Sequence, residues 1–341
     1  MKRKIIIGLF VLIVFAASFF AWKVFGPTAN SLEGEFFYVK TGESFQDMKD
    51  DILKNNIIKT RIWFDWAAQL MKFRIAKAGK YKINEGMSLF QLIRMLKNGR
   101  QTPINLIITK SRLKENIAQK LGKLFEFDSS EAMKFINHND SLKPYGLDTF
   151  TVMAVILPDT YSYFWNSTVK KVFQKLFDEW QIFWNEERKT KASKLGLSPI
   201  QVTTLASIID EESNYVPEKN IIASVYLNRI TKKMPLQADP TIKFALKDFA
   251  LKRVYEKHLL IESPYNTYKN TGLPPGPICT AQKETIDAVL NAPETDYLYF
   301  VAKSDFSGTH IFTTNYKDHI AKAKEYQQAL DKQDSIRKEN K

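Results

Sequence analysis

The chain has 341 residues, of which 44% are hydrophobic and 26% are charged, with a formal net charge of +13 at pH 7. Its length predicts roughly two domains, and its composition is that of a globular protein. The positive charge indicates either an anionic neighbour or simply a soluble basic surface. Because the lysines are scattered and no cluster of arginines accompanies them, we expect no nucleic-acid partner.

The sequence contains no motif that is typical of a metal site or a cofactor site. The single cysteine, Cys279, excludes an internal disulfide and a cysteine-ligated metal site. The four histidines have no metal-binding spacing, and the sequence contains neither a phosphate-binding loop nor a serine-hydrolase elbow. We therefore expect neither a metal nor a cofactor.

The N-terminal segment predicts a membrane anchor over residues 1–23. Residues 5–22 form an uncharged apolar run that, at about 1.5 Å per residue, nearly crosses a hydrocarbon core of roughly 30 Å. The basic residues 2–4 should stay in the cytoplasm, which places the rest of the chain outside a single-pass inner (cytoplasmic) membrane, in the periplasm. The competing interpretation is a signal sequence cleaved near residues 16–18.

A small α+β module is predicted after a short linker at residues 24–34. It extends over residues 35–109 and alternates short apolar strands with serine-capped amphipathic helices. The expected strands are 36–39, 80–83 and 104–108, and the expected helices are 44–55, 62–73 and 88–98.

Residues 110–334 predict a second, mostly helical domain, with a polar tail at 335–341. Residues 111–136 are expected to be mostly helical and residues 169–190 to form a long amphipathic helix, with a polar loop at 138–148. The aromatic segment 157–165 fits a sugar-binding cleft and a core cluster equally well. Near the end, a helix at 285–290 precedes a β-hairpin made of residues 297–302 and 309–312 and a helical tail from residue 316.

Residues 198–246 are the most informative stretch of this domain. Ser198 and Pro199 begin a helix, and helical phase places Glu212 on the same face as the apolar residues 205, 208 and 209. Asp210 and Glu211 point elsewhere. A carboxylate on an apolar face is costly to desolvate, so Glu212 is either a functional group or part of a buried ion pair, for example with Arg229.

Further polar side chains are expected in the same region. A second helix, begun by Pro217, carries Asn228 and Arg229, and the following rigid loop at 234–241 carries Gln237 and Asp239. The loop at 263–278 is rich in glycine and proline and therefore stiff, which suits a binding wall. It contains Tyr265, Asn266 and Tyr268.

Five motifs in this order resemble the endolytic murein transglycosylases, the YceG-like family. They are LASIIDEE (205–212), YLNR (226–229), MPLQADPT (234–241), YNTY (265–268) and GLPPGPI (272–278). The resemblance covers nearly the whole chain. It implies an α+β protein with one transmembrane helix, a LysM-like module, and a catalytic domain with a small β-hairpin. The chain departs from the family pattern at several positions: Asp210 stands in place of a glutamate, Ser213 in place of a threonine, Ala238 where threonine or serine is common, and Met153-Ala154 where many members have Glu-Gly.

The resemblance also implies a reaction. Such an enzyme cleaves the β-1,4 MurNAc–GlcNAc bond of peptidoglycan glycan strands and leaves 1,6-anhydro-MurNAc ends, in cell wall assembly and remodelling. Glu212 would be the catalytic acid and then the base. The implied substrate-binding residues are Asn228, Arg229, Gln237, Asp239, Tyr265, Asn266 and Tyr268. The implied partners are the glycan strands, the inner membrane through residues 5–22, and cell-wall synthesis proteins.

Two other functions fit the sequence. One is a membrane-anchored peptidoglycan-binding protein without activity. The other is a muramidase-type hydrolase that uses water, for which a second positioned carboxylate is usual and Asp239 is the candidate.

Overall fold

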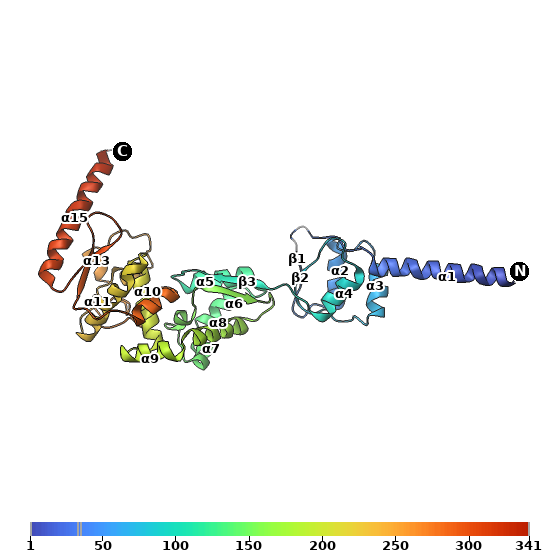
Figure 1. The fold of residues 1–341 in the computed structure, drawn as a ribbon, viewed down its shortest axis with the longest axis horizontal. Helices are drawn as coiled ribbons and strands as arrows, with labels where there is room; N and C mark the ends of the chain where they lie inside the picture. Colours follow the sequence, from blue (N-terminus) through green and yellow to red (C-terminus); the bar gives the residue numbers. More distant parts are fainter. Residues whose placement is uncertain (1, 33, 35, 340–341) are drawn as a thin grey trace. The chain divides into compact units, whose positions relative to one another are not determined.

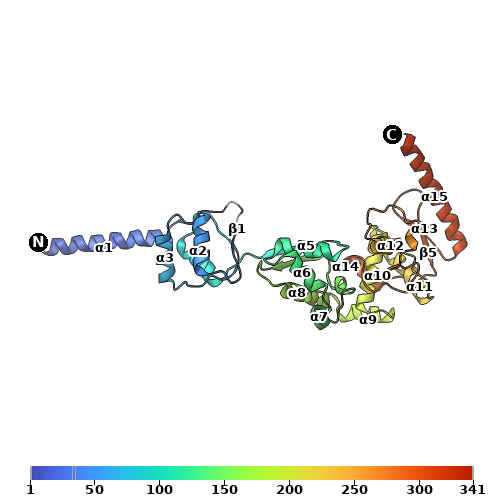
Figure 2. The same ribbon diagram turned by 180° about the vertical axis from the view of Figure 1, so that it is seen from behind.

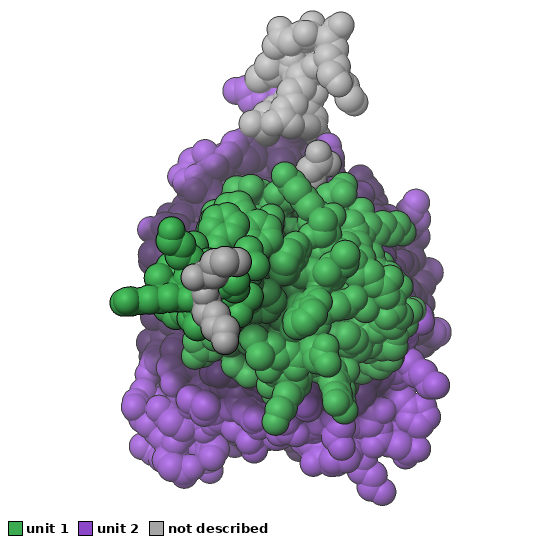
Figure 3. Space-filling model, turned by 90° about the vertical axis from the view of Figure 1, so that its right-hand side faces the viewer, with its two compact units in different colours: residues 1–106, 122–128, 162–168 green, residues 107–121, 129–161, 169–341 purple. Residues whose placement is uncertain are grey.

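The computed structural model describes residues 2–32, 34 and 36–339. It confirms the mixed α+β class and divides into two compact units, coloured separately in Figure 3. Unit 1 comprises residues 1–106, 122–128 and 162–168, and unit 2 comprises residues 107–121, 129–161 and 169–341. Residues 340 and 341 of the predicted polar tail lie outside the described residues, as does residue 35, where the first module was expected to begin.

Unit 1 holds the apolar N-terminal helix and the small α+β module (Figure 1). Its elements are α1 (Lys2–Phe25), β1 (Phe36–Val39), α2 (Phe45–Lys54), α3 (Arg61–Leu70), β2 (Gly79–Lys82) and α4 (Leu89–Asn98), followed by the start of β3 (Ile104–Ile108). Strands β1 and β2 are antiparallel, with Phe36 opposite Lys82 and Val39 opposite Gly79. The helix α1 is long and apolar enough to cross a membrane, and its apolar stretch is not buried in the structure.

The caps predicted for two helices of unit 1 are present. Ser44 accepts a hydrogen bond from the backbone of Asp47 and begins α2, and Ser88 forms a complete capping box with Gln91 at the start of α4. Buried apolar side chains from β1, β2 and the three helices α2, α3 and α4 form one core. The end of α1 joins this core through Val24, so the module and the end of the helix are packed together.

Unit 2 is mostly helical. Its elements are α5 (Lys114–Leu124), α6 (Ser129–Ile136), α7 (Asn139–Leu142), η1 (Lys143–Tyr145), η2 (Val152–Val155), β4 (Asp159–Tyr163), α8 (Val169–Phe183), α9 (Glu186–Lys194), α10 (Pro199–Glu212), η3 (Val216–Glu218), α11 (Lys219–Thr231), α12 (Asp239–Leu246), α13 (Glu256–Leu259), α14 (Lys283–Leu290), β5 (Tyr299–Ala302), β6 (His310–Thr313) and α15 (Tyr316–Glu339). Strand β4 pairs with β3, and β5 pairs with β6 as the predicted hairpin. Figure 2 shows the same arrangement from behind.

Several predicted elements differ from the structure. The expected helix at 169–190 is two helices, because Asn185 caps a new start at α9 and accepts a hydrogen bond from the backbone of Arg188. The loop expected at 138–148 contains the short helices α7 and η1. The rigid loop at 234–241 ends in α12, which begins at Asp239 because Pro240 fits the first helical turn.

The aromatic segment at 157–165 contributes mainly to the core. Tyr161 and Tyr163 are buried, and the Tyr161 hydroxyl donates a hydrogen bond to the Leu157 carbonyl at 2.8 Å. Residues 159–163 form β4. Of the two interpretations of this segment, the core cluster therefore fits these tyrosines.

Helix α10 is central to unit 2. It packs against α9, α11, α12 and α14, and its residues 202–210 are buried. The Ser207 hydroxyl accepts a hydrogen bond from the backbone of Ile278 at 3.0 Å, which fastens the glycine- and proline-rich loop to α10. The same loop passes so close to Phe150 that a Cβ at Gly276 would lie 2.0 Å from the Phe150 carbonyl oxygen. Only glycine fits there, so the loop is held in place by close packing.

Candidate active site

Glu212 is the last residue of α10, where the buried helix reaches the surface. Its carboxylate accepts a hydrogen bond from the Tyr226 hydroxyl of α11 at 2.7 Å. The three apolar residues that share its face, Leu205, Ile208 and Ile209, are fully buried, as their spacing predicted. The helix thus places one carboxyl group, itself only partly exposed, at the edge of an apolar core.

The protonation of Glu212 follows from this environment. Burial raises the pKa of Glu212 to about 7, the hydrogen bond from Tyr226 partly opposes the rise, and the nearby charge of Asp239 adds to it. Lys243 is close enough to lower the pKa slightly. A carboxylic acid with this pKa is substantially protonated near neutral pH, so Glu212 can donate a proton and afterwards accept one.

The two carboxylates that precede Glu212 have other partners, in agreement with helical phase. Asp210 is buried and forms an ion pair with Lys219 at 2.5 Å, and it also accepts hydrogen bonds from the Thr285 hydroxyl and the Gln282 backbone. Glu211 forms ion pairs with Arg112 at 2.8 Å and Lys110 at 3.2 Å. Glu212 differs from both because, among the described residues, its carboxylate forms no ion pair with a lysine or arginine and instead bonds the Tyr226 hydroxyl.

Asn228 and Arg229 of α11 are engaged with backbone carbonyls. The Asn228 amide donates to the carbonyls of residues 295 and 297 at 2.7 and 2.9 Å. Arg229 is buried and donates to the carbonyls of residues 298 and 236 at 2.6 and 2.9 Å. Together they connect α11 to the segment that leads into β5 and to the start of the 234–241 loop.

Gln237 and Asp239 lie beside this pair and are exposed. The Gln237 side chain accepts a hydrogen bond from Arg229 at 3.3 Å, and its backbone has a φ of 50°. The Asp239 carboxylate accepts a hydrogen bond from the Tyr268 hydroxyl at 2.5 Å. Burial, followed by the charge of Asp239, raises the pKa of Tyr268 well above its usual value, so its hydroxyl remains a donor. These side chains present polar atoms near Glu212.

The loop that contains Tyr265 and Asn266 combines a buried side chain that braces the backbone with a half-buried ring that lines a cavity. Asn266 is fully buried, and its amide donates to the carbonyls of Leu259 and Ile261, both at 2.9 Å. Tyr265 packs against Phe244 with a distance of 4.7 Å between ring centroids. Its ring lines a cavity of about 240 Å³ together with Arg112 and Lys114.

A second cavity, of about 120 Å³, adjoins the first and leads towards the carboxylates. It shares Arg112 and Phe244 with the first cavity and is also lined by Glu211, Pro240 and Lys243. Lys243, which lines the smaller cavity, also lowers the pKa of Glu212, and Glu211 of the same cavity directly precedes Glu212 on α10. The residues that line both cavities, Arg112 and Phe244, are basic and aromatic.

The structure thus brings together Glu212, Arg229, Asp239 and Tyr268, whose charges influence one another. Gln237 is connected to this group by its hydrogen bond with Arg229. The side-chain amides of Asn228 and Asn266 instead donate hydrogen bonds to backbone carbonyl groups. Sequence reasoning did not assign a role to Tyr226, which contacts Glu212 directly. The available signal was a tyrosine three residues before Arg229, hence on nearly the same face of α11. Among the described residues, no group of three or more His, Cys, Asp or Glu could hold a metal ion.

These features define a class of protein: an α+β chain with one apolar N-terminal helix and a site built around a single protonatable carboxyl group. The YceG-like family model matches residues 37–325, so the chain belongs to the YceG-like family.

Named relatives agree with this assignment. An endolytic murein transglycosylase of Bacillus subtilis is 32% identical over 305 residues, covering 84% of this chain and 83% of the relative. One from Streptococcus pneumoniae is 26% identical over 322 residues, covering 85% of this chain but 58% of the relative. The crystal structure of a YceG-like protein from Listeria monocytogenes superposes with a TM-score of 0.56 at 25% identity, covering 84% of this chain and 98% of that one.

The buried ion pair of Asp210 gives a stability prediction. Replacing Lys219 with methionine leaves the Asp210 charge buried without its cation, which typically costs about 3–5 kcal/mol. We expect Lys219→Met to lower the free energy of unfolding by this amount in urea titrations followed by circular dichroism. Lys232→Met, at an exposed lysine after the same helix, is the control and should change it by less than about 0.5 kcal/mol. Equal stability of the two variants would contradict the assignment.

Proposed function

We propose that the protein is a membrane-anchored lytic transglycosylase that cleaves the β-1,4 MurNAc–GlcNAc bond of peptidoglycan glycan strands, with Glu212 as its catalytic acid and base. The observation that carries this proposal is the single carboxyl group with a pKa raised to about 7 at the end of a buried helix whose preceding residue, Glu211, lines a cavity. The names of the relatives support the substrate class.

The reaction follows from the protonation of Glu212. Its proton goes to the glycosidic oxygen as the bond between that oxygen and C1 of MurNAc breaks, and the positive charge that develops at C1 is oxocarbenium-like. The Glu212 carboxylate then removes the proton of the 6-hydroxyl of the same sugar while O6 bonds to C1. The carboxylic acid is regenerated, and the products are a 1,6-anhydro end and a new GlcNAc end, without consumption of water.

The remaining predicted residues divide into two groups in this proposal. Gln237, Asp239, Tyr265 and Tyr268 present side chains at the site and would bind the sugar and its substituents. Asn228, Arg229 and Asn266 would act indirectly, because their polar atoms hold the backbone that carries those side chains. Tyr226 is a positioning residue that orients the Glu212 carboxyl through its hydroxyl.

We also propose roles for the rest of the chain. Residues 35–109 would be a LysM-like module that holds glycan strands, and the residues from 110 to 334 the catalytic domain. The helix α1 would anchor the protein in the inner membrane with its basic start in the cytoplasm. Cell-wall synthesis proteins remain the predicted protein partners.

The orientation can be tested with a reporter fused after Lys341. We expect an enzyme that folds only outside the cytoplasm to be active at this position, and the protein to remain in the membrane fraction at high salt. The reason is that the basic residues 2–4 are retained on the cytoplasmic side. A soluble, N-terminally shortened product would instead identify residues 5–22 as a cleaved signal sequence.

The central test is the change Glu212→Gln. The amide has no labile proton, so we expect turnover of purified glycan strands to fall by at least about 10²-fold while the thermal melting profile is retained. Glu294→Gln, at an exposed glutamate, is the matched control and should retain full turnover. Wild-type turnover by Glu212→Gln would exclude Glu212 as the acid.

Mass spectrometry of the wild-type products separates the two reaction types in the same experiment. A lytic transglycosylase leaves anhydro-muramyl ends, which are one water lighter than reducing ends. Products that carry only reducing ends, with oxygen taken up from labelled water, would indicate a hydrolase with Asp239 as the base. If neither the wild-type protein nor the Glu212→Gln variant releases products, the result would favour the binding protein without activity.

The pH profile tests the role of Tyr226. Its hydroxyl bonds the Glu212 carboxylate and thereby lowers the pKa of that group, so Tyr226→Phe should raise it. The protonated form then persists to higher pH, and the alkaline limb of kcat/KM should move upwards. Tyr316→Phe, which removes the hydroxyl of an exposed tyrosine, is the control. A loss of activity without any shift of the limb would mean that Tyr226 has only a packing role.

A further inference from the structure

The helix α3 of unit 1 carries an apolar stripe that its own core does not cover. Ile62, Trp66 and Leu70 are spaced four residues apart, so they lie along one face, and their exposed fractions are 66%, 59% and 66%. The opposite face, with Phe64, Ala67 and Ala68, is buried in the core. A ten-residue helix that is apolar on both faces requires a second apolar environment.

The position of α3 along α1 indicates what that environment is. The ring of Phe20 in α1 contacts Trp63 at 5.9 Å and Trp66 at 6.0 Å, and Phe19 contacts Trp63 at 5.8 Å. Phe19 and Phe20 belong to the apolar run that ends at residue 22. At about 1.5 Å per residue, they lie within roughly 5 Å of that end along the axis of α1. The stripe on α3 is therefore next to the end of the candidate membrane span.

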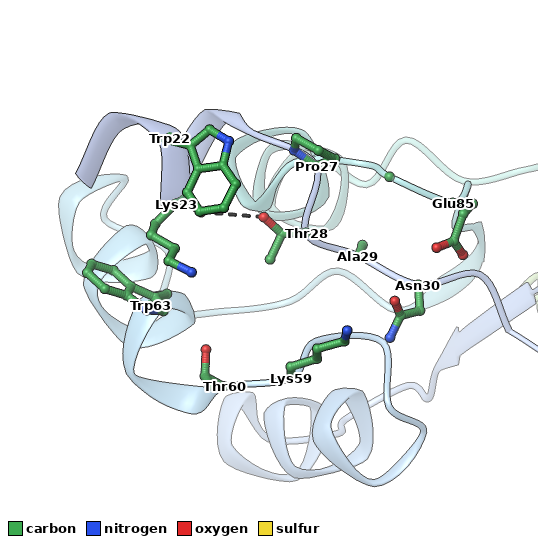
Figure 4. A pocket seen from close by; sticks show the side chains of 11 residues that line it. Trp22, Lys23, Pro27, Thr28, Ala29, Asn30, Lys59, Thr60, Trp63 and Glu85 are labelled. Atoms are coloured by element: carbon green, nitrogen blue, oxygen red, sulfur yellow. Dashed lines mark hydrogen bonds between the residues drawn. The ribbon is translucent and has the colours of Figure 1, made fainter. Parts of the chain in front are cut away.

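The chemistry around this level is that of a membrane interface. A cavity of about 340 Å³ lies where α1 ends and is lined by the aromatic side chains of Trp22 and Trp63 and the basic side chains of Lys23 and Lys59. Figure 4 shows Trp22, Lys23 and Trp63 along one side of the cavity and Lys59 towards another. Tryptophan and lysine are the residues that anchor proteins at the level of lipid headgroups. Glu85 also lines the cavity, so two basic side chains and one acidic side chain are present there.

The polar side of the stripe is consistent with an orientation along the membrane surface. Arg61 and Asp65 lie beside the stripe and form an ion pair at 3.5 Å, and Asp65 also pairs with Lys49 of α2 at 2.9 Å. The helix thus has a charged edge directed towards the rest of the module and an apolar edge directed away from it. This distribution is typical of an interfacial amphipathic helix.

We propose that the face of unit 1 formed by the end of α1 and by α3 rests on the outer surface of the bilayer that α1 spans, with Ile62, Trp66 and Leu70 immersed among the lipids. The proposal rests on the membrane anchor proposed above and adds a second contact with the same bilayer. The consequence is that the small module is held against the membrane instead of turning freely about α1. Its contact with lipid would fix the direction in which strand β2, at the other end of the module, faces the cell wall.

The test uses the full chain reconstituted in phosphatidylethanolamine–phosphatidylglycerol vesicles. An environment-sensitive fluorophore is attached to single cysteines at Ile62→Cys, Trp66→Cys and Leu70→Cys, since the native Cys279 is buried and inaccessible. Phe10→Cys, exposed within the apolar run of α1, is the positive control for immersion. Lys82→Cys is the negative control, because Lys82 is exposed and belongs to β2, the strand at the end of the module away from α1 (Figure 1).

We expect lipids with a shallow spin label to quench the three α3 positions at least about threefold more strongly than residue 82, and iodide in the water to quench them less. Lipids with a spin label deep in the acyl chain should quench residue 10, which is about 18 Å from residue 22 along α1. When Ile62 and Leu70 are both replaced by serine, the fluorophore at residue 66 should be quenched less by the spin-labelled lipids and more by iodide. The matched change Ile107→Ser, at an exposed isoleucine of β3, should not.

The controls separate failure of this proposal from failure of the anchor. Lipid quenching at residue 10 but not at the three α3 positions would leave the anchor intact and overturn the surface contact. No lipid quenching at residue 10 would overturn both. Protection of the α3 positions from lipid and iodide alike would show that a protein, either a second copy or another partner, covers the stripe, which also overturns the proposal.

Discussion

The buried ion pair between Asp210 and Lys219 is the interaction on which unit 2 depends most. It joins α10 to the first residue of α11, and the Thr285 hydroxyl, which bonds both partners, adds α14 to the same point. A buried pair of this kind contributes less to net stability than to definition of one packing arrangement, because desolvation offsets much of the attraction. Here it fixes how α10 and α11 meet. The bond between Glu212 and Tyr226 requires that the two helices meet in this way.

Three consecutive carboxylates on α10 consequently have three different environments. Asp210 is buried with a cation, Glu211 is held by Arg112 and Lys110 at a cavity, and Glu212 is bonded by a neutral hydroxyl beside apolar side chains. Successive residues of a helix are about 100° apart, so each points to a different neighbour. Burial raises the pKa of Glu212, whereas Lys219, Arg112 and Lys110 are paired with its two neighbours. The ion pairs of Asp210 and Glu211 thus leave Glu212 as the carboxyl group that we propose as the proton donor.

Local sequence patterns predicted much of this arrangement. The rest depends on contacts between residues far apart in the sequence, which such patterns do not reveal. The serine caps of α2, α4 and α10, strand β1 and the apolar face that carries Glu212 depend on residues a few positions apart, and all were predicted. The Glu212–Tyr226 bond joins residues fourteen positions apart and depends on the packing of two helices. The predicted alternative of an ion pair between Glu212 and Arg229 does not form, because Arg229 donates to backbone carbonyls, and the buried pair uses Asp210 and Lys219. Composition cannot distinguish a polar side chain that meets a ligand from one that braces a loop.

The character of the site favours a reaction with one acid–base group over one with two. A group that first donates and then accepts a proton works best when its pKa lies near the ambient pH, as the pKa of Glu212 does. Hydrolysis would require a second carboxylate free to activate water, and one oxygen of Asp239 already accepts the Tyr268 hydroxyl at 2.5 Å. An internal 6-hydroxyl needs no such activation site, because its attack is intramolecular and gains an advantage on the order of 7–11 kcal/mol in well-oriented reactions. In the proposed reaction the residues that surround Glu212 would hold the sugar so that this hydroxyl faces C1. Bonds that fix the 234–241 loop to α11, the 263–278 loop to α10 and the two loops to each other are suited to that task.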